Sequence, residues 1–467
     1  MKNYIINKIV FFSLLVFSIS SCESFLSQTS TSDVSDGDMF TDFASLESAR
    51  IGMYNTLQNQ YYYGGYYQLM VDAYSDNGAT GGYDNLDLDE LGSKAATANN
   101  IYIENTWIAI YNTIYTANRI LENIDLIADP LLGDELKNDI KGEALTIRAL
   151  AHFDLLRMFG EHWDINSAFG IPVVTTVLAT DNVIGRNTVA NTYDAIINDL
   201  SSAENLLSND DLRLEEPVFK GVQFITNSAC QALLARVYQY KKDYVNAALY
   251  ANTVITSGFA SSLGADDFTT IYTVKFTSES IFEIVFDGQD KSQFNALTYA
   301  RTDALRSEVS FLAAEDLKLF FESRPADLRN VLVNFVENDV SIEPDGRTEK
   351  YRGEVFQDNS AFILRISEMI LIRAEAIGFA GGGIADLNYL RSLRGLSDAV
   401  VANEIEFNQL LSDERRSELN FEGHRYFDLA HFGILNDVLG PDVLPCLPIP
   451  QREINASGGA IIQYPGY

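Results

Sequence analysis

The sequence predicts a mainly α-helical protein, built as a degenerate tetratricopeptide-like helical repeat with a loop-rich, irregular insertion. Apolar residues recur every three to four positions along most of the chain, which is the period of one helix face. Small residues recur where one predicted helix follows another, as in Ala229, Ala232 and Ala235 before Ala247 and Ala251. Alanine there lets antiparallel helices approach closely, and the unequal spacing of these pairs makes the repeat degenerate.

The helical period is clearest in segments that turn-forming residues separate. Predicted helices span residues 41–60, 104–127, 135–159, 189–207, 223–241, 244–257, 362–379, 384–394 and 405–419. Turn and aromatic residues fill 61–100, 261–310 and 336–360 instead. Because long irregular loops on a rigid scaffold commonly carry binding sites, we expect a single body over 41–467 with ligand loops at about 61–100 and 261–360.

The first 21 residues have the features of a signal peptide. Lys2 and Lys8 make a basic start, and the apolar stretch 9–19 is shorter than the ~20 residues of a membrane-spanning helix. The stretch ends in the tetrapeptide ISSC at Cys22, which is the lipobox pattern of bacterial lipoproteins. We therefore expect cleavage before Cys22, its lipidation, and a polar tether over 22–40. The alternative is an ordinary signal peptide with a cysteine nearby by chance.

Composition and missing motifs argue against several functions. The chain has 33 Lys+Arg against 65 Asp+Glu, and a formal charge of -32 repels phosphate backbones, so nucleic acid is not expected as a partner. The H-E-x-x-H, G-x-x-x-x-G-K-[ST] and G-x-S-x-G patterns are absent, so we predict no catalytic residue and no enzyme. Carboxylate pairs for glycoside hydrolysis are uninformative among so many acidic residues.

No metal or cofactor is predicted. Asp84, Asp87, Asp89 and Glu90 could hold a structural calcium ion, but they lack the EF-hand spacing, and a solvated acidic face is the simpler interpretation.

Four blocks of the sequence carry family motifs. They are the helix from Trp107 to Arg119, the run Arg148–Gly160 (RALAHFDLLRMFG), the segment Leu364–Ala376 (LRISEMILIRAEA) and the block Glu414–Leu429 (ERRSELNFEGHRYFDL). In order and spacing these blocks resemble the SusD/RagB family, the surface nutrient-binding lipoproteins of Bacteroidetes-type bacteria. The resemblance spans the chain from Cys22 to Tyr467 and implies a SusD-like helical fold, anchored by lipid to the surface of the outer membrane.

The resemblance also implies a function. The protein is expected to bind an oligomeric nutrient, most often a glycan, and to deliver it to a SusC-like TonB-dependent transporter that it covers as a lid. A peptide ligand is the alternative, because one branch of the family binds peptides. Two explanations outside the family stay open, a helical scaffold that only docks protein partners and an acidic secreted hydrolase.

A tyrosine-rich, Gly-containing segment stands out as the candidate binding surface. Exposed tyrosine offers flat apolar area and a hydroxyl at low rotamer cost, which suits sugar rings or peptide backbones. In the resembled family, known sites lie in loops at corresponding places in the chain. The predicted ligand-binding residues are Tyr62, Tyr66, Tyr67, Asp76, Asn77, Tyr83, Asn85, Phe294, Tyr299 and Arg301. The alternative is that these tyrosines pack the loop onto the helices.

The charged residues of the C-terminal block are predicted to be architectural. Their spacing allows ion pairs between guanidinium and carboxylate groups within and between helices. The residues concerned are Arg415, Arg416 and Arg425 with Glu414, Glu418, Glu422 and Asp428.

Overall fold

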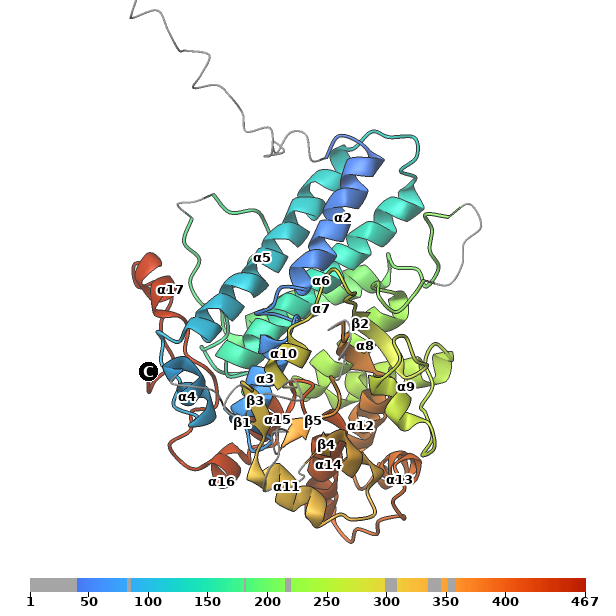
Figure 1. Ribbon diagram of the computed structural model, residues 1–467. Helices are drawn as coiled ribbons and strands as arrows, with labels where there is room; N and C mark the ends of the chain where they lie inside the picture. The colour runs from blue at the N-terminus through green and yellow to red at the C-terminus, as the bar shows by residue number, and fades with distance from the viewer. Residues whose placement is uncertain are drawn as a thin grey trace, which may run out of the picture.

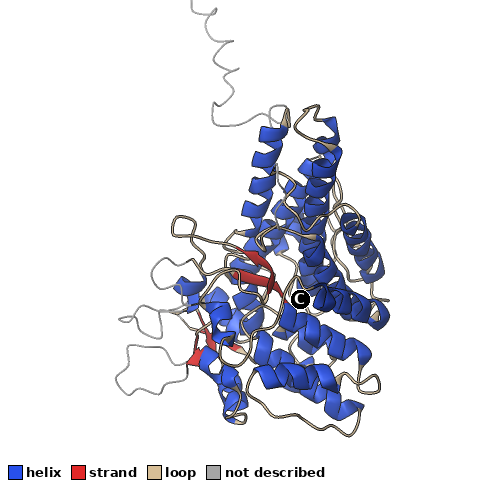
Figure 2. Ribbon diagram, turned by 90° about the vertical axis from the view of Figure 1, so that its right-hand side faces the viewer, coloured by secondary structure: helices blue, strands red, loops and turns tan. Residues whose placement is uncertain are grey.

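The computed structural model describes residues 40–81, 85–179, 182–214, 220–298, 309–334, 346–351 and 358–467. It confirms the mainly helical fold. Figure 1 shows long helices in the N-terminal half of the chain, and Figure 2 shows that strands form only small patches beside them. The tetratricopeptide-like character of the repeat stays a prediction.

The long helices pack in sequence order. α5, α6, α7, α8 and α9 each pack against the next, and α12 then packs against both α9 and α8. The described helices are α2 (Phe43–Leu57), α3 (Tyr66–Ala73), α4 (Leu86–Gly92), α5 (Ile101–Asn123), α6 (Asp134–Phe159), α7 (Val189–Glu204), α8 (Asn227–Tyr240), α9 (Tyr244–Ser257), α10 (Phe294–Thr298), α11 (Glu315–Glu322), α12 (Ile366–Ile377), α13 (Ile384–Leu393), α14 (Glu404–Leu419), α15 (Arg425–His431), α16 (Leu435–Leu439) and α17 (Gln451–Ala456).

Capping side chains decide where several helices begin. The Asn100 side chain accepts hydrogen bonds from the backbone N–H groups of Tyr102 and Ile103, so α5 starts three residues before the predicted position. Thr226 caps α8 in the same way, which shortens the helix predicted from residue 223. Side-chain caps satisfy N–H groups that have no partner within the helix. Caps are harder to predict from sequence than the apolar period, so the predicted starts of these helices are less accurate.

Two parts of the chain differ from the prediction. The helix predicted from residue 362 begins as strand β6 (Ala361–Arg365), which pairs antiparallel with β2 (Ser280–Ile284), and becomes helical only at Ile366. The segment 61–100 is not an irregular loop, since it contains α3, α4 and strand β1 (Gly78–Thr80). β1 pairs antiparallel with β3 (Phe311–Ala313). A third two-stranded pair joins β4 (Val333–Asn334) to β5 (Arg347–Thr348).

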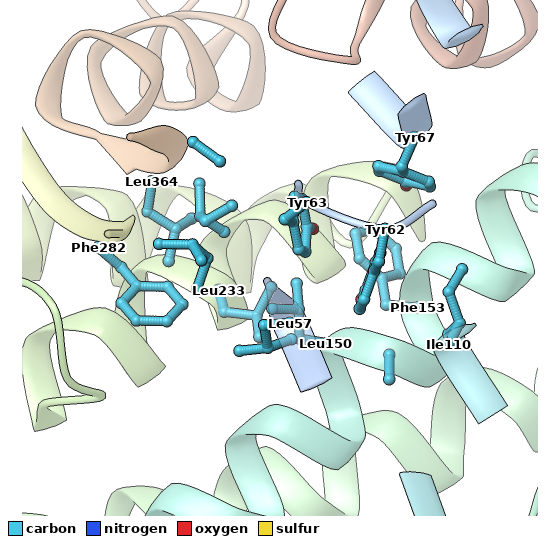
Figure 3. Close-up of a cluster of buried hydrophobic side chains, with 14 of the residues drawn as sticks. Leu57, Tyr62, Tyr63, Tyr67, Ile110, Leu150, Phe153, Leu233, Phe282 and Leu364 are labelled. Carbon is cyan, nitrogen blue, oxygen red and sulfur yellow. The ribbon is translucent and has the colours of Figure 1, made fainter. Parts of the chain in front are cut away.

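Most of the buried apolar side chains form one cluster, which runs from Leu46 in α2 to Ile461 near the end of the chain. Figure 3 shows part of it, where Leu150 and Phe153 of α6 lie among tyrosines of the 61–67 segment. A second, smaller cluster lies between α12, α13 and α14 and includes Phe407. Most of the tyrosine-rich segment therefore belongs to the main core, and Tyr61 and Tyr66 pack against that core while staying partly exposed.

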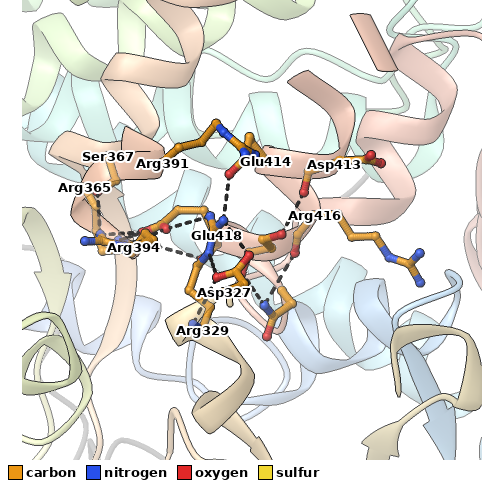
Figure 4. Close-up of polar contacts among 12 residues, drawn as sticks. Asp327, Arg329, Arg365, Ser367, Arg391, Arg394, Asp413, Glu414, Arg416 and Glu418 are labelled. Atoms are coloured by element: carbon orange, nitrogen blue, oxygen red, sulfur yellow. Dashed lines mark hydrogen bonds and ion pairs between the residues drawn. The ribbon is translucent and has the colours of Figure 1, made fainter. Parts of the chain in front are cut away.

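A buried ionic network ties α14 to the rest of the molecule (Figure 4). The Glu418 carboxylate lies 2.9 Å from Arg394, 3.1 Å from Arg365 and 3.3 Å from Arg329, which all come from other elements. Within the C-terminal block itself, Arg415 pairs with Asp428 at 2.8 Å. The block is structural as predicted, but most of its ion pairs reach outside it.

Candidate functional site

One carboxylate of α6 holds the tyrosine-rich segment, residues 61–67, in place. Asp154 accepts hydrogen bonds from the hydroxyls of Tyr62 and Tyr63, each at 2.6 Å, and of Tyr67 at 3.0 Å. Arg157 pairs with the same carboxylate at 2.6 Å. Burial, and then the charge of Asp154, raise the pKa of the Tyr62 hydroxyl, so it remains a donor at neutral pH.

These contacts correct two predicted site residues. The side chains of Tyr62 and Tyr67 are 0% and 1% exposed, so they belong to the core and offer no face to a ligand. For them the packing alternative is the correct one. The reason is that the buried Asp154 carboxylate of α6 needs hydrogen-bond donors, and the hydroxyls of these tyrosines supply them.

Three further predicted residues are also buried. Asp76 pairs with Arg425 at 2.7 Å and with Arg416 at 3.0 Å. Burial acts to raise the pKa of the Asp76 carboxyl, but hydrogen bonds from Arg425 and the charges of Arg425 and Arg416 lower it overall. Asn77 accepts a hydrogen bond from Arg416 and donates one to Asp72.

Phe294 is 0% exposed and stacks on Tyr351 with ring centroids 4.0 Å apart. The expectation that Asp76, Asn77 and Phe294 present their side chains to ligand is therefore wrong, because each is used in packing or in holding the C-terminal block.

Tyr66 belongs to a row of three stacked rings, which we call the aromatic stack. Its ring centroid lies 5.2 Å from that of Tyr61 and 5.0 Å from that of Tyr102, with interplanar angles of 23° and 25°. All three rings are only partly buried. Asn85, another predicted residue, donates a hydrogen bond to the Tyr102 hydroxyl at 2.8 Å. Because Tyr66 lies between its neighbours, both faces of its ring are covered, and Tyr61 and Tyr102 form the two ends of the stack.

The sequence did not identify Tyr61 and Tyr102 as candidate site residues. Tyr61 stands in the same tyrosine run as the predicted residues, but nothing local separates inward from outward rings. Tyr102 follows Asn100, the cap of α5, and only the folded arrangement brings it beside Tyr66.

The β1–β3 pair brings together the two loops expected to bind ligand. Thr80 lies opposite Phe311, and the Gly81 N–H donates to the Ser310 carbonyl at 3.1 Å. The ring of Phe311 meets Tyr66 edge-on, with centroids 6.0 Å apart. The chain therefore enters 82–84 and leaves 299–308 at one place beside the aromatic stack. Tyr83, Tyr299 and Arg301 lie outside the described residues and stay predictions.

The described parts of the chain contain no group of three or more His, Cys, Asp or Glu side chains placed to hold a metal ion. Of the residues considered for calcium, Asp84 lies outside the described residues. Asp87 accepts a hydrogen bond from the Ile101 N–H, and Glu90 accepts one from the Thr97 N–H. These carboxylates serve the junction of α4 and α5. Within the same residues, no helix combines the length and the apolarity needed to cross a bilayer.

The fold defines a class of mainly helical proteins with small two-stranded sheets, and comparison with known proteins identifies the family. A family model described as "Starch-binding associating with outer membrane" matches residues 24–239, and the SusD family model matches residues 344–437. SusD-like protein P25 of Formosa agariphila is 23% identical over 97% of each chain. The chain belongs to the SusD/RagB family.

Solved structures agree with this assignment. A SusD superfamily protein from Bacteroides vulgatus is 26% identical, with a TM-score of 0.78 and coverage of 92% of this chain and 100% of that one. A laminarin binding SusD-like protein shares the fold, at 21% identity and a TM-score of 0.74, with coverage of 92% and 100%.

Proposed function

We propose that this protein binds an oligosaccharide at the cell surface and delivers it to a SusC-like, TonB-dependent outer-membrane transporter. The observation that carries the proposal is the aromatic stack beside the β1–β3 pair, where the chain enters 82–84 and leaves 299–308, in a chain of the SusD/RagB family. Partly exposed tyrosine rings suit the apolar faces of sugar rings, and their hydroxyls can bond to sugar hydroxyls. One solved relative of this fold is described as binding laminarin, which supports a glycan ligand.

Tyrosine truncation at the stack tests the proposed site. Tyr61→Ala and Tyr102→Ala should each weaken binding of the best glycan found in a panel about tenfold, which is about 1.4 kcal/mol. Tyr389→Ala is the matched control, since Tyr389 is 51% exposed on α13, outside the proposed site. Isothermal titration calorimetry with each variant measures the change. Unchanged affinity in both stack variants would move the site elsewhere, and binding of peptides in place of glycans would assign the other ligand class.

The proposed role is capture without cleavage. The described contacts of the stack come from tyrosine, asparagine and phenylalanine, and none of them is a carboxylate pair of the kind that glycoside hydrolysis uses. Incubation of the purified protein with the bound glycan should therefore give no shorter products by chromatography. Turnover that disappears when one carboxylate is changed would refute this.

Attachment to the outer membrane through Cys22 is part of the proposal. Cys22 lies outside the described residues, and the lipobox sequence is its support. In Cys22→Ala cells the protein should leave the outer-membrane fraction, and on wild-type cells it should be open to added protease. A variant that still pellets with outer membrane would contradict the anchor.

The transporter partner can be tested separately. Purification of the protein from detergent-solubilised outer membranes should recover a SusC-like barrel, because a lid on a transporter needs an extensive contact. Recovery of the lipoprotein alone at low salt would count against a stable complex.

A further inference from the structure

A groove of about 400 Å³ lies on the outer side of α5. Trp107, Ile108 and Tyr111 form one wall, and the other is formed by Pro172, Val174, Leu178, Asn182, Val183 and Ile184. α17 closes the end of the groove with Glu453. Figure 1 shows α17 beside the N-terminal part of α5. No part of this groove belongs to the aromatic stack.

The lining is mainly apolar and suits an apolar side chain that has a polar or charged neighbour. Val174, Leu178 and Val183 offer no hydrogen-bonding side chains, and Val183 is 54% exposed at the rim. The polar side chains of the lining are those of Asn182, Ser457 and Glu453. The Tyr111 hydroxyl already donates to the Pro172 carbonyl at 2.8 Å. Accessible apolar grooves of this kind on soluble proteins commonly mark sites where a partner places an apolar anchor.

One charge in the groove has no counter-charge in the described part of the chain. The Glu453 carboxylate is half-buried among the apolar lining, and no basic side chain there pairs with it. Its neighbour Arg452 instead lies 3.7 Å from Glu104. Arg186, which is also near, donates to the backbone carbonyls of Gly170, Phe159 and Ile462. A carboxylate in an apolar groove favours a ligand that brings a cation.

We infer that this groove is the docking site for a protein partner that presents an apolar side chain next to a lysine or arginine. The apolar anchor fills the space between α5 and Val183, and the cation pairs with Glu453. The groove residues of α5 lie about 120° to 180° around the helix axis from Tyr102. Partner and sugar can therefore be bound at the same time. The inference adds to the proposed function and does not depend on it.

Thiol protection tests whether a partner covers the groove. The two described native cysteines, Cys230 and Cys446, are 0% exposed, so Val183→Cys adds an accessible thiol at the rim. Val400→Cys is the control, because Val400 is 93% exposed and lies far along the chain in the α13–α14 connection. Maleimide labelling rates are measured for the full chain, purified in detergent and in outer membranes of the bacterium that produces it. Position 183 should be labelled at least tenfold more slowly in the membranes, with position 400 unchanged.

Two further labelling experiments decide what covers the groove. Adding Glu453→Lys should restore fast labelling of position 183 in membranes, whereas Glu404→Lys, at an exposed carboxylate of α14, should not. The protein alone in phosphatidylethanolamine–phosphatidylglycerol vesicles should be labelled as fast as in detergent. Equal rates in outer membranes and detergent, protection by these vesicles alone, or protection that survives Glu453→Lys would each overturn the inference.

Discussion

At the residue scale, the tyrosines of the seven-residue segment 61–67 have two different roles, since some are buried in the core and others are partly exposed. Tyr62, Tyr63 and Tyr67 point to Asp154, whereas Tyr61 and Tyr66 join the aromatic stack. The sequence could not separate them, because a Gly-rich turn has no period and the deciding carboxylate is about ninety residues away. One local signal existed, since an aspartate inside the apolar run of α6 requires buried donors.

Asp154→Asn should lower the free energy of unfolding by about 3 kcal/mol. The change leaves Arg157 without its buried counter-charge and weakens the hydrogen bonds from three tyrosines. Urea unfolding followed by circular dichroism measures the loss. Asp437→Asn, at an exposed aspartate of α16, should change the stability by less than about 0.5 kcal/mol. Because Asp154 positions the segment that carries Tyr61, glycan affinity should also fall. A fully stable Asp154→Asn protein would contradict the anchoring role.

His152 should make stability fall in acid. Burial, and then the charge of Arg148, lower its pKa from 6.5 to about 3, and its Nε2 accepts a hydrogen bond from the Val174 N–H. Between those two values the unfolded chain binds a proton that the folded protein does not. This contribution is therefore complete above pH 6.5 and is lost at about 1.4 kcal/mol per unit as pH falls toward 3.

The His152→Gln variant isolates this effect, because glutamine can accept the same hydrogen bond without titrating. Its free energy of unfolding should decrease less than that of the wild type between pH 7 and pH 5, by about 2 kcal/mol. Identical slopes for the two proteins would show that His152 does not titrate as inferred.

At the element scale, long amphipathic helices were predicted well and short paired elements were not. Helices such as α5 and α7 carry their own apolar period, so local sequence specifies them. Strands β2 and β6 are five residues each, and each exists only because it pairs with a strand far along the chain. The two-residue strands β4 and β5 carry no local pattern at all. The site depends on this second kind of element, since β1 and β3 bring its loops together.

The turn between α14 and α15 should tolerate substitution poorly. Gly423 has a φ of +79°, and a Cβ added there would lie 3.1 Å from the Gln68 Cα. Gly433 has a similar φ of +72° with open space around it. Gly433→Ala should therefore cost about 1 kcal/mol of stability from backbone conformation, and Gly423→Ala about 3 kcal/mol, because it adds a clash with backbone. Equal melting temperatures for the two variants would contradict this close contact of the turn with α3.

At the scale of the whole molecule, sequence patterns were sufficient for the class and the family. The apolar period predicted the helical fold, and the motif blocks predicted membership of SusD/RagB, because both are properties of local sequence. The ligand surface depends on which side chains the completed core leaves outside. Five of the ten predicted site residues are buried, two lie in or beside the aromatic stack, and three lie outside the described residues.

The smaller core between α12, α13 and α14 raises the question of whether it can unfold alone. Buried charges argue that it cannot. Arg236 of α8 pairs with Glu368 of α12 at 2.5 Å and also donates to the Ile363 carbonyl. Unfolding of α12 alone would therefore leave the Arg236 guanidinium buried in the main core without its counter-charge. Calorimetry of the whole protein should therefore show one transition, with equal calorimetric and van't Hoff enthalpies.

Glu368→Leu alone should remove about 3 to 5 kcal/mol of stability, because Arg236 stays buried without its partner. The double variant Arg236→Met with Glu368→Leu should recover much of that loss, since apolar side chains of similar volume can replace a buried pair. If the pair couples the two cores, the single variant should also split the calorimetric transition, with the smaller core melting first, and the double variant should restore a single one. Two transitions in the wild type would show instead that α12, α13 and α14 fold as a separate unit, and that the ionic contacts only orient it.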